Sequence, residues 1–576
     1  MHISITTKGL LKFLGLILFY ATLSAIMAIT LNSKGIVWGG DDAPFHIGRL
    51  ISLNYSFQHG NFIPSISNSN FRQIGYGINL FYPWITIAPI ALLFSLFSNP
   101  ITAFYTGIGI YFFISFLISH LVMTKFSKSF WNAIIFSLFY NLSNYLLIEV
   151  LPRTDIAEFI ATILLPICFL GLYEIFFRDF HKWNLLAIGM SGLLLTHLLS
   201  TVIVSFFFII ILLLYIIKSN NYWNRIKALF KAILATICAG AIFLIPFLNE
   251  ITYQPYEQPS PYTLKGKVLE KMINASFANS SIQSASGNTY NIGVFLLVAL
   301  ILGLIFFYKF TPLYKSIYVL AFLSFFMTTD IFPWDLFQNT PIRVIQFPFR
   351  FLMVATLLTA VIAAKLLIML IESFHMSKLQ LPITILLAII LCGFWISSAQ
   401  TAQQQKMISK KTQIITSKQI KKHSVYEDYY EQYSPAAAGK FIKSTIWHIG
   451  KINNQKITFN PQAKGESTVF KLGEMSKNTV IELPIIRYKN TELTINGKRA
   501  KISTSKNGTV KTKLNKKIKH PNFKVTYKTT NLAIFSAALS LVTWISLLLG
   551  LNNKNRYDWE NMKKSLKNIV NNDSAV

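Results

Sequence analysis

The chain has few charged residues and few cysteines, and it lacks the common nucleotide-binding and hydrolase motifs. Only 13% of its 576 residues are charged, and its three cysteines all lie inside apolar runs, so neither a disulfide framework nor a thiolate metal site is indicated. No Walker loop, no GxGxxG turn after a strand, no HExxH and no GxSxG occurs. Nucleotide-driven transport and serine hydrolysis therefore have no support in the sequence.

Long apolar runs take up most of the chain. Hydrophobic residues make up 53% of it and the mean hydropathy is +0.46, which is typical of a polytopic α-helical membrane protein. The first run, 10–31, is too long for a cleaved signal sequence and predicts a retained signal-anchor helix. We expect about 12–14 spans, from this run and from the runs at 81–98, 101–123, 130–149, 156–177, 183–199, 201–217, 228–249, 291–308, 314–329, 344–371, 380–399 and 530–551.

Basic residues indicate the orientation of these spans. The short linkers 178–182, 218–231, 309–315 and 365–378 are basic, and the positive-inside rule assigns them to the cytoplasm together with both termini. This alternation predicts a multi-pass membrane protein with both termini in the cytoplasm. It holds only if the run 81–98, which contains two prolines, does not cross fully. The external segments are then 32–80, 153–158, 250–290, 330–343 and 401–529.

The polar stretch 401–529 differs from the rest of the chain. It contains 26 Lys and Arg residues against seven acidic ones. Short alternating runs separated by the turn signals Asn496-Gly497 and Asn507-Gly508 predict a small extracytoplasmic β-sandwich of about ninety residues. Because this charge lies outside the membrane in the predicted topology, nucleic acid is not an expected partner. The predicted divisions are a transmembrane module 1–400, the external domain 401–529, a last span 530–551 and a cytoplasmic tail 552–576.

Two adjacent carboxylates, Asp41 and Asp42, follow the first apolar run directly. Charges at the end of a membrane helix are costly unless they are solvated, paired or used. If a helix begins near Ala43, then Asp42, His46 and Arg49 lie on one face of it, at i, i+4 and i+7. The alternative is that the acids only cap the helix. The functional interpretation is a carboxylate that takes a proton from an acceptor hydroxyl or holds a cation against a phosphate.

A second charged cluster, Arg153, Asp155 and Glu158, lies at another helix end on the same predicted side. It is either an interfacial ion-pair group or the set of acids that completes the site begun by Asp42. His197 lies near a predicted external turn, where a structural role is favoured.

A third cluster contains Arg343, Gln346 and Arg350. The two arginines are seven residues apart and could share one helix face, where a guanidinium suits phosphate recognition. The alternative is snorkelling of both side chains to lipid headgroups.

The ordered set of these motifs resembles bacterial membrane proteins labelled YfhO-like or "6-pyruvoyl-tetrahydropterin synthase-related", which are similar to glycosyltransferases of the GT-C superfamily. The resemblance spans most of the chain, although each motif alone is weak. It rests on 41–49, on 75–83 with Tyr82, on 153–159 leading to Leu165-Pro166, on 346–350, on Tyr433-Ser434-Pro435, and on Leu483-Pro484 to Tyr488 before Asn496-Gly497.

The resemblance implies transfer of a sugar from a polyprenyl-phosphate donor to an extracytoplasmic acceptor, such as lipoteichoic acid, another wall polymer or a glycan. Membrane lipids are further expected partners. A divalent cation such as Mg²⁺ or Mn²⁺ is left open, because the second motif is less acidic than the metal sites of some GT-C enzymes. The rival functions are a lipid-linked sugar flippase and a non-catalytic cell-envelope assembly protein. The residues assigned to catalysis are Asp41, Asp42, His46, Asp155 and Glu158, and those assigned to substrate binding are Arg49, Tyr82, Arg153, Arg343, Gln346 and Arg350.

Overall fold

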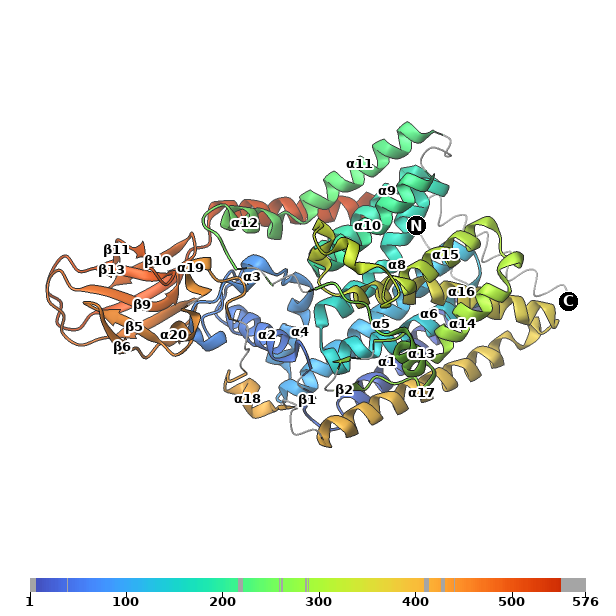
Figure 1. The fold of residues 1–576 in the computed structure, drawn as a ribbon, viewed down its shortest axis with the longest axis horizontal. Helices are drawn as coiled ribbons and strands as arrows, with labels where there is room; N and C mark the ends of the chain where they lie inside the picture. The colour runs from blue at the N-terminus through green and yellow to red at the C-terminus, as the bar shows by residue number, and fades with distance from the viewer. Residues whose placement is uncertain are drawn as a thin grey trace.

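The protein consists of a helical bundle with a β-sandwich at one end, as the computed structural model in Figure 1 shows. The structure describes residues 7–550 except 39, 216–220, 258, 260–262, 285–286, 289, 409–413, 426–429 and 440. The predicted tail 552–576 lies outside the described residues.

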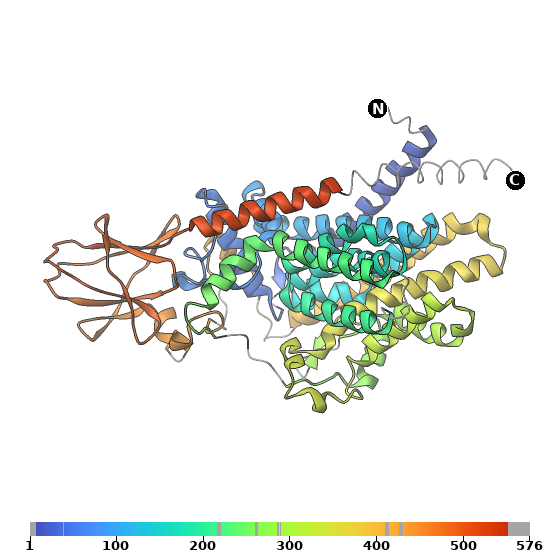
Figure 2. The same cartoon turned by 90° about the horizontal axis from the view of Figure 1, so that it is seen from above.

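Most of the apolar runs form helices. In chain order the principal helices are α1 Thr7–Leu31, α2 Ala43–Gln58, α3 Ile78–Phe81, α4 Ala88–Leu96, α5 Pro100–Ser127, α6 Phe130–Asn141, α7 Asn144–Ile148, α8 Ile156–Phe177, α9 Trp183–Leu194, α10 Leu198–Tyr215, α11 Tyr222–Ala239, α12 Ala241–Ile251, α13 Leu269–Phe277, α14 Val294–Ile305, α15 Pro312–Phe326, α16 Leu352–Ser373 and α17 Gln380–Ile408. A last helix, Asn531–Gly550, returns from the β-sandwich along the bundle (Figure 2).

Seven helices in the described part of the chain are long and apolar enough to cross a membrane, or eight if the bent pair α11 and α12 forms one span. These helices are consistent with a membrane protein. Four further apolar helices have only 10–17 residues, which is less than the roughly 20 residues that a bilayer requires. The finer count of about 12–14 spans therefore stays a prediction.

The segment 81–98 forms a short helix, as its prolines indicated. Its apolar helical part covers only Ile85–Leu96, and α4 packs on α2 and α5. Nine to twelve helical residues rise about 14–18 Å, roughly half of a hydrocarbon core. The span buried most completely is Phe130–Arg153, which comprises α6, α7 and a π-helical turn, η3 Glu149–Arg153. This segment delivers the second charged motif to the buried interior of the protein.

The expected β-sandwich is present between residues 449 and 527. Its two five-stranded sheets have the orders β11-β10-β14-β8-β7 and β12-β13-β9-β5-β6, and apolar side chains from both sheets form one core between them. Both predicted Asn-Gly turns contain a glycine with positive φ, at Gly497 and Gly508, where glycine pays no steric cost. The strands are β5 Ile449–Ile452, β6 Gln455–Thr458, β7 Gln462–Lys464, β8 Ser467–Lys471, β9 Val480–Ile486, β10 Thr491–Ile495, β11 Lys498–Ala500, β12 Ser503–Thr504, β13 Thr509–Lys513 and β14 Asn522–Tyr527.

The sandwich rests on the loop that follows α2, so it is fixed to the bundle by more than its two chain connections. The backbone N–H of Gly77 donates to the hydroxyl of Tyr488 at 2.9 Å, and the N–H of Ile486 donates to the carbonyl of Ile74. A separate apolar cluster fills this junction. Residues 60–82 are therefore a platform between the sheets and the helices (Figure 1).

Candidate functional site

The first two charged motifs meet through their backbones. The N–H of Asp42 donates to the carbonyl of Arg153 at 3.1 Å. A Cβ added to Gly40 would lie 2.1 Å from the carbonyl oxygen of Pro152. The two segments of backbone therefore approach more closely than a residue with a side chain at position 40 would allow. Thr154 has a left-handed φ of 57° between η3 and α8. This tight turn brings the two acidic segments side by side.

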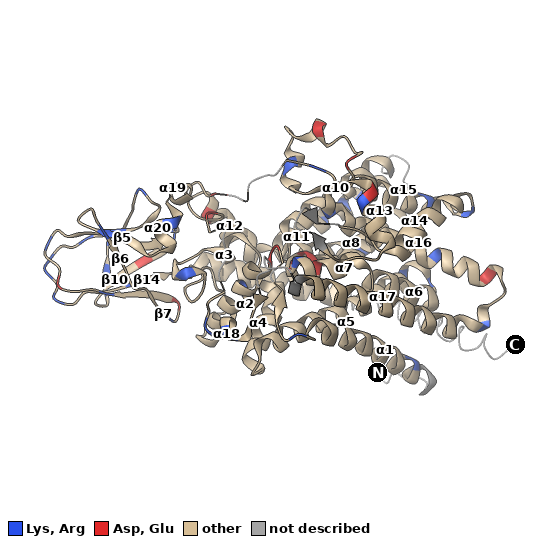
Figure 3. Cartoon of the chain, turned by 60° about the horizontal axis from the view of Figure 1, so that its bottom comes forward, with Lys and Arg blue, Asp and Glu red and all other residues tan. Residues whose placement is uncertain are grey.

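The guanidinium of Arg153 is the centre of a buried group of charges. Its NH1 lies 2.6 Å from an oxygen of Glu149 and 2.8 Å from one of Glu158, and its NH2 lies 3.0 Å from Asp155 and 3.5 Å from Asp42. We call Asp42, Glu149, Arg153, Asp155 and Glu158 the Arg153 cluster. Four of its members lie in η3 or at the start of α8, and Figure 3 shows charged residues beside α7 and α8 in the middle of the molecule.

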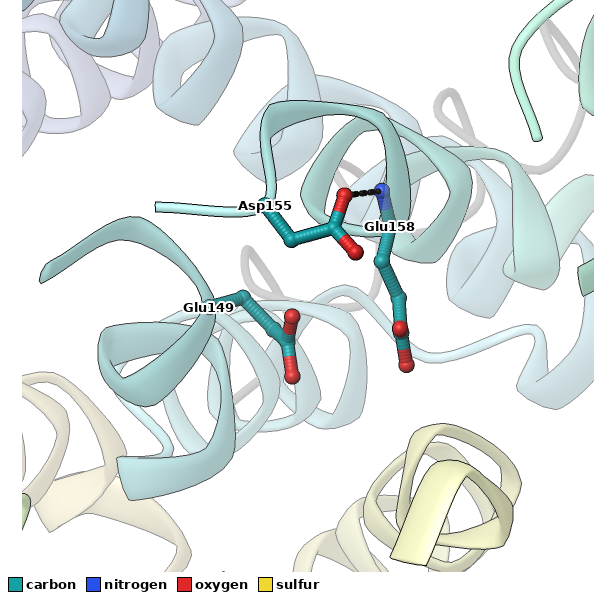
Figure 4. A group of neighbouring side chains, drawn as sticks. All are labelled: Glu149, Asp155 and Glu158. Carbon is teal, nitrogen blue, oxygen red and sulfur yellow. Dashed lines mark hydrogen bonds between the residues drawn. The ribbon is translucent and has the colours of Figure 1, made fainter. Parts of the chain in front are cut away.

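Acidic side chains from two elements converge on this cluster. Figure 4 shows the carboxylates of Glu149, Asp155 and Glu158 close together, with Asp155 accepting from the backbone N–H of Glu158. Asp155 is thus the N-cap of α8. Glu158 also accepts from the hydroxyl of Tyr145 at 2.7 Å. These bonds hold the acids in fixed positions inside the bundle.

Asp42 behaves differently from the capping residue that the sequence also allowed. It occupies the N-cap position of α2, yet its side chain makes no capping hydrogen bond and faces Arg153 instead. Its side chain is 37% exposed, whereas that of Asp155 is 5% exposed. Enclosure by the protein, with the nearby carboxylate of Asp155, raises the pKa of Asp42 to about 8 despite the opposing effect of Arg153.

His46 joins the cluster one turn further along α2. Its Nε2 lies 3.2 Å from Asp155, as the shared helix face with Asp42 predicts. Burial lowers the pKa of His46. Burial also opposes ionisation of Asp155, but the charge of Arg153 and the hydrogen bond from His46 outweigh this effect and lower its pKa well below the usual value. Asp155 is therefore an ionised structural partner, and Asp42 is the acid of the Arg153 cluster that solvent reaches.

Arg49 lies on the same face but contacts another group. Its guanidinium lies 4.3 Å from the ring centroid of Tyr82 and donates to the backbone carbonyls of Tyr82 and Pro83. The ring of Tyr82 in turn lies edge-on to His46 and stacks on His197. The buried Arg49 and the half-buried Tyr82 thus pack next to His46.

Arg350 connects the third motif to the site. The Nε of Arg350 lies 3.4 Å from Glu158, and its NH1 donates to the side chain of Gln346 at 2.9 Å. The expectation that Arg343 and Arg350 share one helix face is wrong. Gln346, with φ of 66°, separates two short 3-10 turns, η7 Pro341–Ile345 and η8 Pro348–Phe351, and Arg343 is half-buried on the first of them.

Asp41 points towards a different wall of the site. It is exposed and accepts from the hydroxyl of Tyr290 at 3.3 Å. The ring of Tyr290 stacks on that of Phe349 with centroids 3.6 Å apart, and the ammonium of Lys267 lies within 6 Å of both rings. Burial lowers the pKa of Lys267, against the attraction of Asp41. This wall adds a cation and an aromatic surface beside the exposed acids.

The sequence arguments did not identify Glu149, Tyr145, Lys267, Tyr290 or Phe349. Glu149 could have been found, because it is an acidic residue at the end of the apolar run 130–149, and acids in such runs are usually functional or paired. Lys267 and Tyr290 carry no local signal, because their contacts with Phe349 and Asp41 join segments that are far apart in the chain.

Three of these acids have the ligand spacing of a metal site. One carboxylate oxygen each from Glu149, Asp155 and Glu158 lies within 4.8 Å of the other two. Arg153, however, donates to all three of these side chains. As arranged, the residues do not fit a divalent ion, because the guanidinium occupies the space between the acids.

Comparison with known proteins leaves the family open. No family model matches the chain. A protein of Lactococcus lactis subsp. cremoris (strain MG1363), described as "Uncharacterized protein", is 27% identical over 236 residues. The matching region covers 38% of this chain and 37% of that protein, so the chain spans well under half the length of this relative.

Proposed function

We propose that this chain is a membrane glycosyltransferase of GT-C type, which moves a sugar from a polyprenyl-phosphate donor to an extracytoplasmic acceptor. The observation that carries the proposal is the position of Asp42. It is a half-exposed acid whose raised pKa suits a general base near neutral pH. It lies against a cluster of buried charges drawn from two further parts of the chain.

The residues around Asp42 have separate parts in the proposed reaction. Asp42 takes the proton of the acceptor hydroxyl as that oxygen attacks the anomeric carbon, and the bond from this carbon to the donor phosphate breaks with inversion. The phosphate leaves with its negative charge, which the ammonium of Lys267 beside Asp41 stabilises. The buried Asp155 and His46 position the chain around Arg153 and do not need to reach the substrate.

The β-sandwich supports an anionic acceptor such as a wall polymer. Residues 449–528 contain 18 Lys and Arg residues and four acidic residues. Such an excess of positive charge attracts a polyanion at a distance of roughly one Debye length. Because the sandwich rests on the platform 60–82, an acceptor bound there stays close to the bundle.

The position of the charges supports transfer rather than transport of a lipid-linked sugar. A transporter is expected to bind its substrate midway along its helices. Here Arg153 is the last residue of its helical span, and Glu158 is the third residue of α8. The cluster thus lies where helices end, which favours chemistry at a membrane surface.

The test is sugar incorporation into cell-envelope polymers in cells that produce Asp42→Asn in place of the wild-type protein. We expect incorporation to fall at least 100-fold, because loss of a general base typically costs 10²–10⁴-fold. The matched control is Asp179→Asn, which alters an exposed acid outside the cluster. Full incorporation by Asp42→Asn and Asp41→Asn, each produced at wild-type level, would refute the proposal.

A further inference from the structure

The carboxylates around Arg153 are almost fully satisfied by the protein itself. Glu149, Asp155 and Glu158 have six carboxylate oxygens, and five of them contact donors from Arg153, Arg350, His46, Tyr145 or the backbone of α8. The sixth, an oxygen of Glu149, is the one with no hydrogen-bond partner in the described part of the chain. Few free oxygens therefore remain for any added ligand.

The guanidinium of Arg153 occupies the position between the three carboxylates that a divalent metal ion would occupy. A Mg²⁺ or Ca²⁺ ion binds carboxylate oxygens at about 2.0–2.6 Å and bridges several of them at once. The NH1 of Arg153 bridges Glu149 and Glu158 at 2.6 and 2.8 Å, while its NH2 binds Asp155. A metal could enter only if this buried side chain left.

Departure of Arg153 is opposed by its surroundings. Its side chain is 3% exposed, and its backbone ends the π-helical turn η3, where its carbonyl accepts from the N–H of Asp42. A guanidinium keeps its charge at all physiological pH values and offers five donors in a fixed plane. It also lies within 6 Å of the rings of Tyr290 and Phe349.

We propose that Arg153 is the resident cation of this site, standing between the carboxylates where a divalent metal would otherwise be required. It is a positioning residue, because it fixes the acids that surround Asp42 and does not itself need to reach substrate. The site accordingly neither binds nor needs Mg²⁺, Mn²⁺ or Ca²⁺. This inference concerns metal binding, so it stands or falls separately from the proposed sugar transfer.

The decisive measurement is Mn²⁺ binding by the purified full-length protein in detergent, followed by electron paramagnetic resonance. We expect the wild-type protein to show no saturable binding up to about 1 mM Mn²⁺, the weak limit of protein sites for divalent ions. Its Tm should be the same in EDTA and in Mn²⁺. The variant Arg153→Ala exposes three carboxylates to one another, so it should bind Mn²⁺ and gain thermal stability from it.

The matched control is Arg178→Ala, which removes an exposed arginine after α8 and should acquire no Mn²⁺ site. Two results would overturn the proposal. One is saturable Mn²⁺ binding by the wild-type protein that Glu149→Gln abolishes. The other is a folded Arg153→Ala protein that binds no Mn²⁺. If Arg153→Ala does not fold, Arg153→Gln is used in its place. The Mn²⁺ titrations of the wild-type protein and of Glu149→Gln still test the proposal without either variant.

Discussion

Substitution of Gly40 by alanine tests whether the two acidic segments must approach as closely as they do. The added Cβ would lie 2.1 Å from the carbonyl oxygen of Pro152 and 2.5 Å from that of Arg153. Both neighbours are backbone atoms of a turn packed inside the bundle, so neither can swing away as a flexible side chain does. The loop that carries Asp42 must therefore move.

The size of the movement follows from this contact. To regain ordinary van der Waals separation from Pro152, the loop must shift by more than about 1 Å, and overpacking of this kind typically costs about 1–3 kcal/mol. The hydrogen bond from the N–H of Asp42 to Arg153 is lost with the shift. A displacement of about 1 Å at a reacting group can lower a rate about 100-fold, so we expect activity to fall more than stability.

Thermal unfolding in detergent and sugar incorporation in cells measure these two effects. Gly473→Ala serves as the control, because a Cβ there meets no atom within 4 Å. The expected pattern is a lowered Tm with about 100-fold less incorporation for Gly40→Ala, and no change in either for the control. If Gly40→Ala keeps wild-type Tm and incorporation, the close approach of the two acidic segments is not needed and the argument for a joint site fails.

Three further predictions use other parts of the structure. The proposed transfer should become about tenfold faster between pH 7 and pH 9, because Asp42, with its pKa raised to about 8, must lose its proton to act as a base; a flat pH–rate profile of the purified protein would contradict this role. Glu158→Gln removes a buried charge that pairs with Arg153 and Arg350 and should lower the unfolding free energy by about 3–5 kcal/mol, whereas the exposed Glu372→Gln should not. Tyr488→Phe deprives the N–H of Gly77 of its acceptor, which should cost about 1–3 kcal/mol; limited proteolysis of the platform 60–82 should accelerate accordingly.

Helices and strands whose position depends on the local sequence pattern could be predicted from that pattern. Helix α2 begins at Ala43, the start assumed when Asp42 and His46 were placed on one face, and strands β5 to β14 lie within the polar stretch 401–529, where alternating runs predicted a β-sandwich. In each case the spacing of apolar residues along the sequence indicates which face of the element is buried. The break in the apolar run 81–98 was also visible, because its prolines interrupt a helix.

Contacts between distant segments were harder to predict. The alignment of Arg343 with Arg350 failed because Gln346 adopts a left-handed φ, which is uncommon for a residue other than glycine. The partners of Asp41 were not predicted because Tyr290 lies 249 positions away along the chain. The periodicity of a short stretch of sequence cannot predict a contact between such distant residues. The contact depends on how loop 250–290 packs against the rest of the protein.

The role of Arg153 shows how burial changes the interpretation of a motif. As a sequence, Arg153, Asp155 and Glu158 suggested a basic residue available to substrate beside two catalytic acids. In the fold, the same arginine is 3% exposed and its guanidinium contacts four carboxylates, so an anionic substrate would have to compete with all of them. A buried charge remains stable only when such partners surround it. The cluster member left accessible by this arrangement is Asp42, and for this reason the proposed chemistry is assigned to that carboxylate, which Arg153 contacts from the buried side.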